Sequence, residues 1–153
     1  MNDTIKPKIL AVVGATASGK TSLGVELAKK YNGEVISADS MQIYKGLDIA
    51  SAKPTTEEMQ GIPHYLIDFL DRDVSFSVSD YVKLANEKIK DIISMEKLPI
   101  IVGGTGLYID SLLNNVKFSE GGNDEVYREK LYTIAREKGN EYLYNILLET
   151  DPV

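Results

Sequence analysis

The chain has 153 residues, of which 43% are hydrophobic and 26% are charged, proportions typical of a globular protein of one domain with an apolar core. It contains no cysteine, which excludes disulfide bonds, thiolate metal sites and a cysteine nucleophile. Its formal net charge of −6 argues against broad contact with a nucleic-acid backbone, although local binding of a nucleic acid stays open.

The N-terminal residues predict one strand and one helix. The run 8–13 predicts a strand covered on both faces, and it is too short to span a membrane. The polar residues before it do not resemble a cleavable signal, so we expect a cytoplasmic protein. Residues 20–31 carry leucine and alanine at helical spacing and precede Asn32 and Gly33, a pattern typical of a helix and its C-terminal cap.

The middle of the chain continues the alternation. Residues 34–37 predict a second short strand, which ends just before Asp39. The polar, glycine-containing stretch 40–62 predicts a functional loop with a helical turn, and 65–68 predict a third short strand. A serine and an aspartate three residues apart begin a predicted helix over 77–95.

The apolar run 100–102 predicts a fourth strand, which stops at the glycine-rich turn 103–106, and a helix is expected over 107–114. Strands that alternate with helices predict a parallel α/β sheet with helices on its faces.

The C-terminal stretch has a different pattern. Residues 120–123 read as a linker, and two helices are expected on either side of Gly139. We therefore divide the chain into a core over 1–118 and, over 119–153, a helical segment that begins an insertion domain.

The most specific motif is GATASGKT at 14–21, which matches the P-loop pattern G-x-x-x-x-G-K-[ST] between a predicted strand and a predicted helix. Gly14 and Gly19 allow the backbone to turn its N–H groups toward an anion, and the following helix adds its N-terminal dipole. Lys20 supplies a positive charge for the terminal phosphates, and the Thr21 hydroxyl can ligate Mg²⁺. Together with the parallel sheet, the motif predicts a P-loop NTPase-like fold.

A P-loop binds a diphosphate without saying which bond breaks. A kinase usually holds Mg²⁺ with an acid at the end of a nearby strand, but 100–102 end in Gly-Gly-Thr, and only Asp39 follows a strand. Asp39 is therefore either a metal partner or a general base. By composition, 39–54 and 103–108 are equally well structural or binding loops, and the single histidine, His64, is more often a packing residue than a catalyst.

Three blocks in order, at 14–21, 37–54 and 102–108, with IPHYLID at 62–68 and FSVSDY at 76–81 between them, closely resemble the bacterial tRNA dimethylallyltransferase family, also called tRNA isopentenyltransferase. The resemblance implies transfer of a dimethylallyl group from dimethylallyl diphosphate to N6 of the adenosine next to the anticodon, in tRNAs that read codons beginning with U. The P-loop would then hold the diphosphate of the donor.

The resemblance also implies roles for single residues. Lys20 would neutralise the diphosphate and Thr21 would bind Mg²⁺, while Asp39 would accept the N6 proton beside Thr105. The residues implied to bind diphosphate are Gly14, Ala15, Thr16, Ala17, Ser18, Gly19, Lys20 and Thr21. Those implied to contact tRNA are Asp39, Ser40, Met41, Gln42, Thr105 and Arg128.

The expected partners are the anticodon stem-loop of tRNA and dimethylallyl diphosphate, with no membrane, and we expect a monomer. Family members are about twice as long, so the core over 1–118 is expected to be incomplete, and 119–153 to begin a tRNA-contacting insertion. Two other readings stay open: a small-molecule P-loop kinase, and an inactive fragment that binds diphosphate or RNA.

Overall fold

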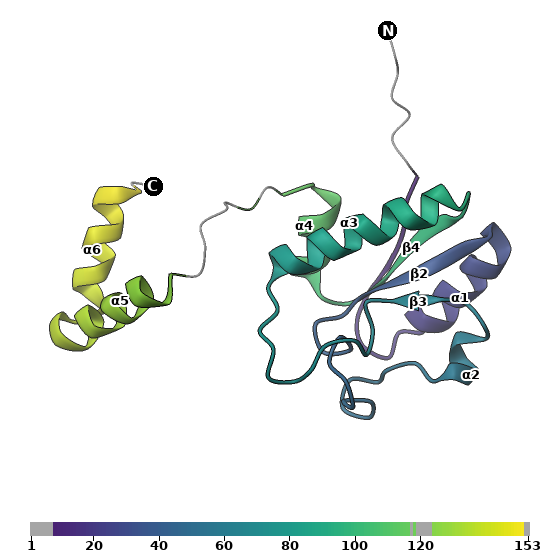
Figure 1. Cartoon of the computed structure of the whole chain (residues 1–153), viewed down its shortest axis with the longest axis horizontal. Coiled ribbons are helices and arrows are strands. Elements are labelled where there is room, and N and C mark those ends of the chain that lie inside the picture. Colours follow the sequence, from purple (N-terminus) through teal and green to yellow (C-terminus); the bar gives the residue numbers. More distant parts are fainter. Residues whose placement is uncertain (1–7, 117, 119–123, 152–153) are drawn as a thin grey trace, which may run out of the picture. The chain divides into compact units, whose positions relative to one another are not determined.

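The structure, a computed structural model, describes residues 8–116, 118 and 124–151. It divides into two compact units, Met1–Lys117 and Phe118–Val153 (Figure 1). The predicted linker at 120–123 lies outside the described residues. No helix among the described residues is long and apolar enough to cross a membrane.

The first unit is built on a sheet of four strands, all parallel, in the order β1-β4-β2-β3 (Figure 1). The strands are β1 (Leu10–Val13), β2 (Gly33–Ala38), β3 (His64–Tyr65) and β4 (Leu98–Gly103). The predicted parallel α/β sheet is therefore confirmed. The two central strands are buried along nearly their whole length, as expected for a sheet covered on both faces.

Helices cover both faces of this sheet (Figure 1). Helix α1 (Lys20–Tyr31) packs through Ala28 on a cluster of alternate strand residues, which comprises Val12, Val35, Ile100 and Val102. The intervening residues Ile36 and Ile101 face the other side, where α3 (Val78–Ser94) packs and α4 (Gly106–Leu113) lies against it. Short helix α2 (Thr56–Met59) contacts α1.

The predicted C-terminal cap of the first helix and the predicted start of the helix over 77–95 are confirmed. Asn32 caps α1 in the left-handed conformation, with φ 52°, and its N–H donates to the Ala28 carbonyl. At the start of α3, Ser77 and Asp80 form a reciprocal capping box, in which the Ser77 hydroxyl accepts from Asp80 N–H at 3.2 Å and the Asp80 carboxylate accepts from Ser77 N–H at 2.9 Å.

Several strand predictions differ from the structure. The strand predicted over 8–13 with both faces covered is Leu10–Val13, and only its Val12 is buried, because it lies at the edge of the sheet with β4 as its single neighbour. The third strand is not 65–68 but His64–Tyr65, because Leu66 and Asp68 adopt left-handed φ values of 57° and 54° that end the extended backbone. Strand β4 begins at Leu98 and includes Pro99, although proline removes a donor from a central strand. The sheet tolerates it because pairing with β1 starts only at Ile100, one residue later.

The second unit consists of two helices, α5 (Glu125–Lys138) and α6 (Asn140–Thr150). They meet at Gly139, which has φ 82° and ends α5, so the two predicted helices are confirmed. None of the described residues of either helix is buried.

Strands β2 and β4 leave no room for a side chain at Gly103, and this contact can be tested. A Cβ at Gly103 would lie 2.2 Å from the Ala38 carbonyl oxygen, so the Gly103→Ala substitution must push the strands apart. We expect it to lower the free energy of unfolding by about 1–3 kcal/mol, measured by urea denaturation. The matched control is Gly106→Ala, because a Cβ there meets nothing within 4 Å; equal losses in both variants would contradict the expectation.

Candidate functional site

Three strands end at one level of the sheet. Gly103 at the end of β4 is the register partner of both Val13 in β1 and Ala38 in β2. The loops that follow, which begin at Gly14, Asp39 and Gly104, therefore start side by side at the carboxyl edge, where open α/β sheets bind ligands.

The loop after β1 has the backbone of an anion site. Gly19, the N-cap of α1, has φ 79° and makes no side-chain cap hydrogen bond. The first helical bond runs from Leu23 N–H to the Gly19 carbonyl at 3.1 Å, so the N–H groups of residues 20–22 precede it. Those N–H groups and the helix dipole attract negative charge. Ala17 is held at φ 61°, a conformation that L-residues rarely adopt outside sites that need it.

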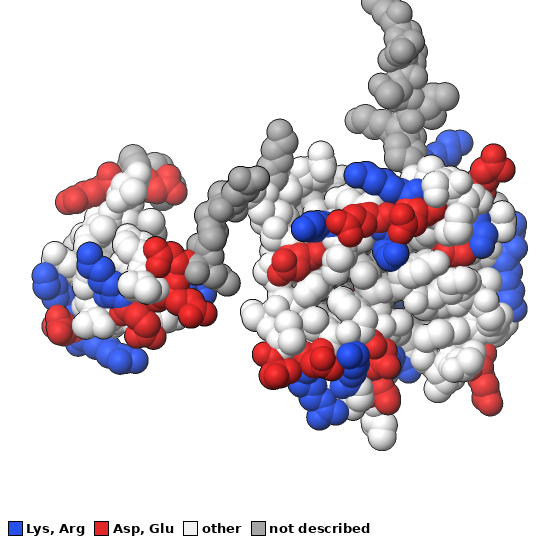
Figure 2. Space-filling model, in the orientation of Figure 1, with Lys and Arg blue, Asp and Glu red and all other residues white. Residues whose placement is uncertain are grey.

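A cavity of about 260 Å³ lies at this edge. It is lined by Thr16, Ala17, Ser18, Gly19, Lys20, Thr21, Ser22, Asp39, Gln42, Ser51, Ala52, Glu58, Val102 and Gly103. The Lys20 ammonium donates to the Ala15 carbonyl within the same loop, so its charge stays beside the anion-binding N–H groups. The face of the first unit seen in Figure 2 mixes acidic and basic side chains and carries no broad basic patch.

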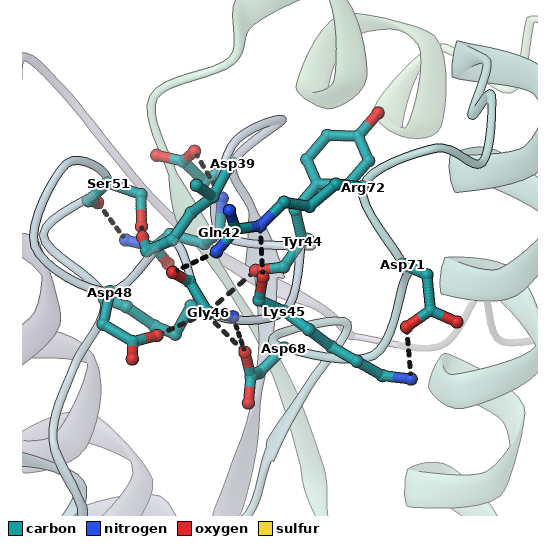
Figure 3. A network of polar contacts seen from close by, with 12 residues as sticks. Asp39, Gln42, Tyr44, Lys45, Gly46, Asp48, Ser51, Asp68, Asp71 and Arg72 are labelled. Carbon is teal, nitrogen blue, oxygen red and sulfur yellow. Dashed lines mark hydrogen bonds and ion pairs between the residues drawn. The ribbon is translucent and has the colours of Figure 1, made fainter.

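One carboxylate oxygen of Asp39 accepts hydrogen bonds from the backbone, and the other is left for a ligand. Oδ1 accepts hydrogen bonds from Met41 N–H at 2.8 Å and Gln42 N–H at 3.2 Å, which holds the turn after β2 (Figure 3). Within the part of the chain that the structure describes, Oδ2 has no hydrogen-bond partner. A carboxylate that lines a cavity with one oxygen held and one free can accept a proton from a ligand.

Thr105 joins the turn after β2 to the turn after β4. Its hydroxyl oxygen accepts from Ser40 N–H at 3.0 Å and lies 3.4 Å from the Ser40 hydroxyl, and its own N–H donates to the Ala38 carbonyl at 3.1 Å. The two contacts with Ser40 cross 65 residues of sequence. Thr105 does not line the cavity itself but supports the residue next to Asp39.

Gln42 closes one side of the cavity. Its Oε1 accepts from the Ser37 hydroxyl at 3.2 Å, and its Nε2 donates to the carbonyls of Ser51 and Ala52 at 3.2 and 3.3 Å (Figure 3). Through these bonds the turn Ser51–Ala52 becomes part of the cavity wall. The sequence places this turn within the loop 39–54 but does not single it out. Glu58 was not predicted as a site residue, and the pattern that could have drawn attention to it is the capping box that it forms with Thr55.

The predicted site residues are therefore only partly brought together. Residues 16–21, Asp39 and Gln42 share the cavity, whereas Gly14 and Ala15 belong to the loop without lining it. Ser40 and Thr105 contact each other and do not line the cavity. Met41 is 50% exposed. Arg128 is an exposed residue of α5 in the second unit, so its predicted role stays a prediction.

His64 has a structural role. Its Nδ1 lies 2.8 Å from the Ile62 carbonyl, and burial lowers the pKa of the imidazole below its usual value. His64 lines a much smaller cavity of about 20 Å³, which shares Thr21, Gln42 and Val102 with the larger one.

The residues around the cavity would hold Mg²⁺ only together with a bound ligand that supplies further oxygen atoms. Among the described residues, no three His, Cys, Asp or Glu side chains cluster to hold a metal. Thr21, Asp39 and Glu58, whose side chains carry oxygen atoms, nevertheless line the cavity. Mg²⁺ is commonly bound by few protein oxygens together with phosphate groups of a substrate, so a diphosphate would complete such a site.

Comparison with known proteins places the chain beside one group of enzymes. The family described as IPP transferase matches residues 42–153. The tRNA dimethylallyltransferase of Thermoanaerobacter sp. (strain X514) is 54% identical over 145 residues, which is 95% of this chain and 46% of the relative. That of Bacillus subtilis (strain 168) is 51% identical over 152 residues, which is 99% of this chain and 48% of the relative.

Solved structures of transferases that act on tRNA are similar to this chain as well. The full-length tRNA isopentenylpyrophosphate transferase from Bacillus halodurans superposes with a TM-score of 0.74 at 47% identity, over 96% of this chain and 48% of its own. A eukaryotic dimethylallyltransferase acting on tRNA gives a TM-score of 0.83 at 34% identity, over 95% of this chain and 36% of its own. The chain thus spans about half the length of the curated relatives it matches.

The anion site predicts an effect of Lys20. In the Lys20→Ala variant, affinity for inorganic pyrophosphate with Mg²⁺, measured by calorimetry, should fall about 10- to 100-fold, because a charged hydrogen-bond donor is lost. Lys29→Ala is the control, since Lys29 lies in the last turn of the same helix and bonds Gln60 instead. Unchanged affinity in Lys20→Ala would remove this loop from the role of diphosphate site.

The Thr105 bridge predicts a loss of stability. Thr105→Val keeps the shape but leaves the Ser40 N–H without its acceptor, so the free energy of unfolding should fall by about 1–3 kcal/mol in urea denaturation. Thr105→Ser retains the hydroxyl and should lose clearly less. If valine and serine were equally destabilising, the hydroxyl would not be what joins the two turns.

Proposed function

This chain belongs to the IPP transferase family, and on that premise we propose that it forms the donor-binding part of a tRNA dimethylallyltransferase. In the reaction, a dimethylallyl group passes from dimethylallyl diphosphate to N6 of the adenosine next to the anticodon. The observation that carries the proposal is the cavity in which the P-loop residues and Asp39 meet. A small-molecule kinase would also use the P-loop, but the relatives named above are tRNA-modifying transferases.

The P-loop binds the leaving group. The N–H groups at the start of α1 and the Lys20 ammonium face the diphosphate, whose negative charge grows as the C–O bond to the allylic carbon breaks. Donors fixed by the backbone need no rearrangement at that moment, so they stabilise the transition state more than free solvent would. Bound with the diphosphate, Mg²⁺ would add positive charge there, with Thr21 as its protein ligand.

Asp39 activates the acceptor. The lone pair of the adenosine N6 attacks C1 of the dimethylallyl group while the C–O bond to diphosphate breaks, and one N6 proton passes to the free Oδ2 of Asp39. Because Oδ1 is held by two backbone N–H groups, the carboxylate keeps its orientation through the step. Diphosphate leaves with the electron pair of the C–O bond, so the step is balanced.

The tRNA must present its base to the cavity. An adenine inside a stacked anticodon loop cannot reach a pocket at a sheet edge, so the base has to leave its stack, as base-modifying enzymes generally require. Ser40, Met41, Gln42 and Thr105 are the proposed contacts in the first unit, and Arg128 is the proposed contact in the second. The net charge of −6 favours local binding of the anticodon loop over broad contact with the phosphate backbone of the tRNA.

The test of the proposed function joins this chain to the remaining half of the Bacillus subtilis relative. The fusion is incubated with unmodified tRNA and labelled dimethylallyl diphosphate, and the tRNA is then digested to nucleosides. We expect N6-dimethylallyladenosine in the digest. Label that stays on the donor, or transfer of phosphate from labelled ATP to a small acceptor, would contradict the proposal.

The same fusion tests Asp39. The Asp39→Asn variant keeps the Oδ1 acceptor for Met41 and Gln42, so the turn should persist while the base is lost. We expect kcat to fall about 10²- to 10⁴-fold with pyrophosphate affinity unchanged. A variant with nearly full activity would show that another group takes the N6 proton.

A further inference from the structure

A buried lysine lies at the centre of the loop that follows Asp39. The Lys53 side chain is only 7% exposed, and its ammonium donates to the Tyr44 carbonyl at 3.0 Å and to the Asp48 carboxylate at 2.7 Å. It also bonds the Asp68 carboxylate. All three donor positions of the ammonium are therefore used.

One of these partners comes from another segment of the chain. Asp48 lies in the same loop as Lys53, whereas Asp68 lies in the segment after β3 and also accepts from Gly46 N–H at 3.3 Å. Burial lowers the pKa of Lys53, but the hydrogen bonds with Asp48 and Asp68 outweigh it and hold this pKa above its ordinary value. The lysine thus stays charged and ties three backbone stretches together.

The residues just before Lys53 form the cavity wall. Ser51 and Ala52 line the cavity, and their carbonyls accept from Gln42 Nε2. Ala52 adopts φ 47°, and the turn is closed by bonds from Ala52 N–H to the Ile49 carbonyl at 3.2 Å and from Lys53 N–H to the Asp48 carbonyl at 3.1 Å. Gln42 holds the two carbonyls of this turn, the Ser51 hydroxyl bonds the Leu47 carbonyl, and the Lys53 side chain anchors the residue that follows the turn to Asp68 in another segment.

We propose that Lys53 is a positioning residue: by clamping Asp48, Asp68 and the Tyr44 carbonyl, it holds the turn Ser51–Ala52 in place as a wall of the diphosphate cavity. This inference rests on the proposed function only in taking diphosphate as the ligand. Lys53 does not itself line that cavity, so it acts through the turn and not by touching the donor.

The experiment uses the complete 153-residue chain. In the Lys53→Met variant, hydrogen exchange of the Ala52 and Lys53 amides, followed by NMR, should accelerate at least about tenfold, because the turn opens more often. Affinity for inorganic pyrophosphate with Mg²⁺ should fall about five- to tenfold. Lys53→Arg keeps the charge and should restore part of both properties.

The matched control is Lys45→Met. Lys45 lies in the same loop and also pairs with a carboxylate, Asp71, at 2.9 Å, but both side chains are more than half exposed, at 51% and 67%, and neither lines the cavity. The Lys45→Met substitution should leave both the hydrogen exchange of the Ala52 amide and the affinity for pyrophosphate unchanged. Should Lys53→Met fail to fold, Asp48→Ala, which removes one exposed partner, should change both properties in the same direction by less.

Two results would overturn the inference: unchanged exchange of the Ala52 and Lys53 amides in Lys53→Met, or faster exchange with unchanged pyrophosphate affinity, since the lysine would then only stabilise the loop. If the unsubstituted chain bound no pyrophosphate, the proposed function would fail instead. The amide exchange would then still decide whether Lys53 orders the turn.

Discussion

The site depends on the close backbone approach of two parallel strands at their carboxyl ends. Gly103 lies so near Ala38 that no side chain fits between them, and the same residue is in register with Val13. The shared register of Gly103 brings the ends of β1, β2 and β4 to one level. Without it the P-loop, the turn with Asp39 and the turn with Thr105 would have no common edge on which to meet.

Main-chain hydrogen bonds then fix the groups that would do the chemistry. Asp39 is held by two N–H groups, Ser40 by the Thr105 hydroxyl, and the turn Ser51–Ala52 by the Gln42 amide. Each of these contacts joins a side chain to a backbone group, and the Thr105 contact joins two different loops. A site assembled in this way is arranged before its ligand arrives, which is what stabilisation of a developing charge requires.

Much of the architecture could be predicted because its signals are local. Apolar runs marked three of the four strands, the capping pattern of Ser77 and Asp80 marked α3, and GATASGKT marked the anion loop. The predicted strand at 65–68 was wrong because the left-handed backbone at Leu66 and Asp68 follows from contacts with the loop after β2, including bonds to the carbonyls of Gln42 and Ile43. Such contacts leave no periodic pattern in the sequence.

The sequence by itself determined the kind of ligand site, since the spacing of glycines, lysine and threonine is enough to build an anion-binding loop. It also determined the family, through blocks that lie far apart in the chain. Only the tertiary structure decided that Thr105 bonds Ser40 across 65 residues and that Lys53 clamps Asp68 across 15. The reason is physical: strand register and loop packing decide which distant groups come within hydrogen-bond distance, and neither is written in the local order of residues.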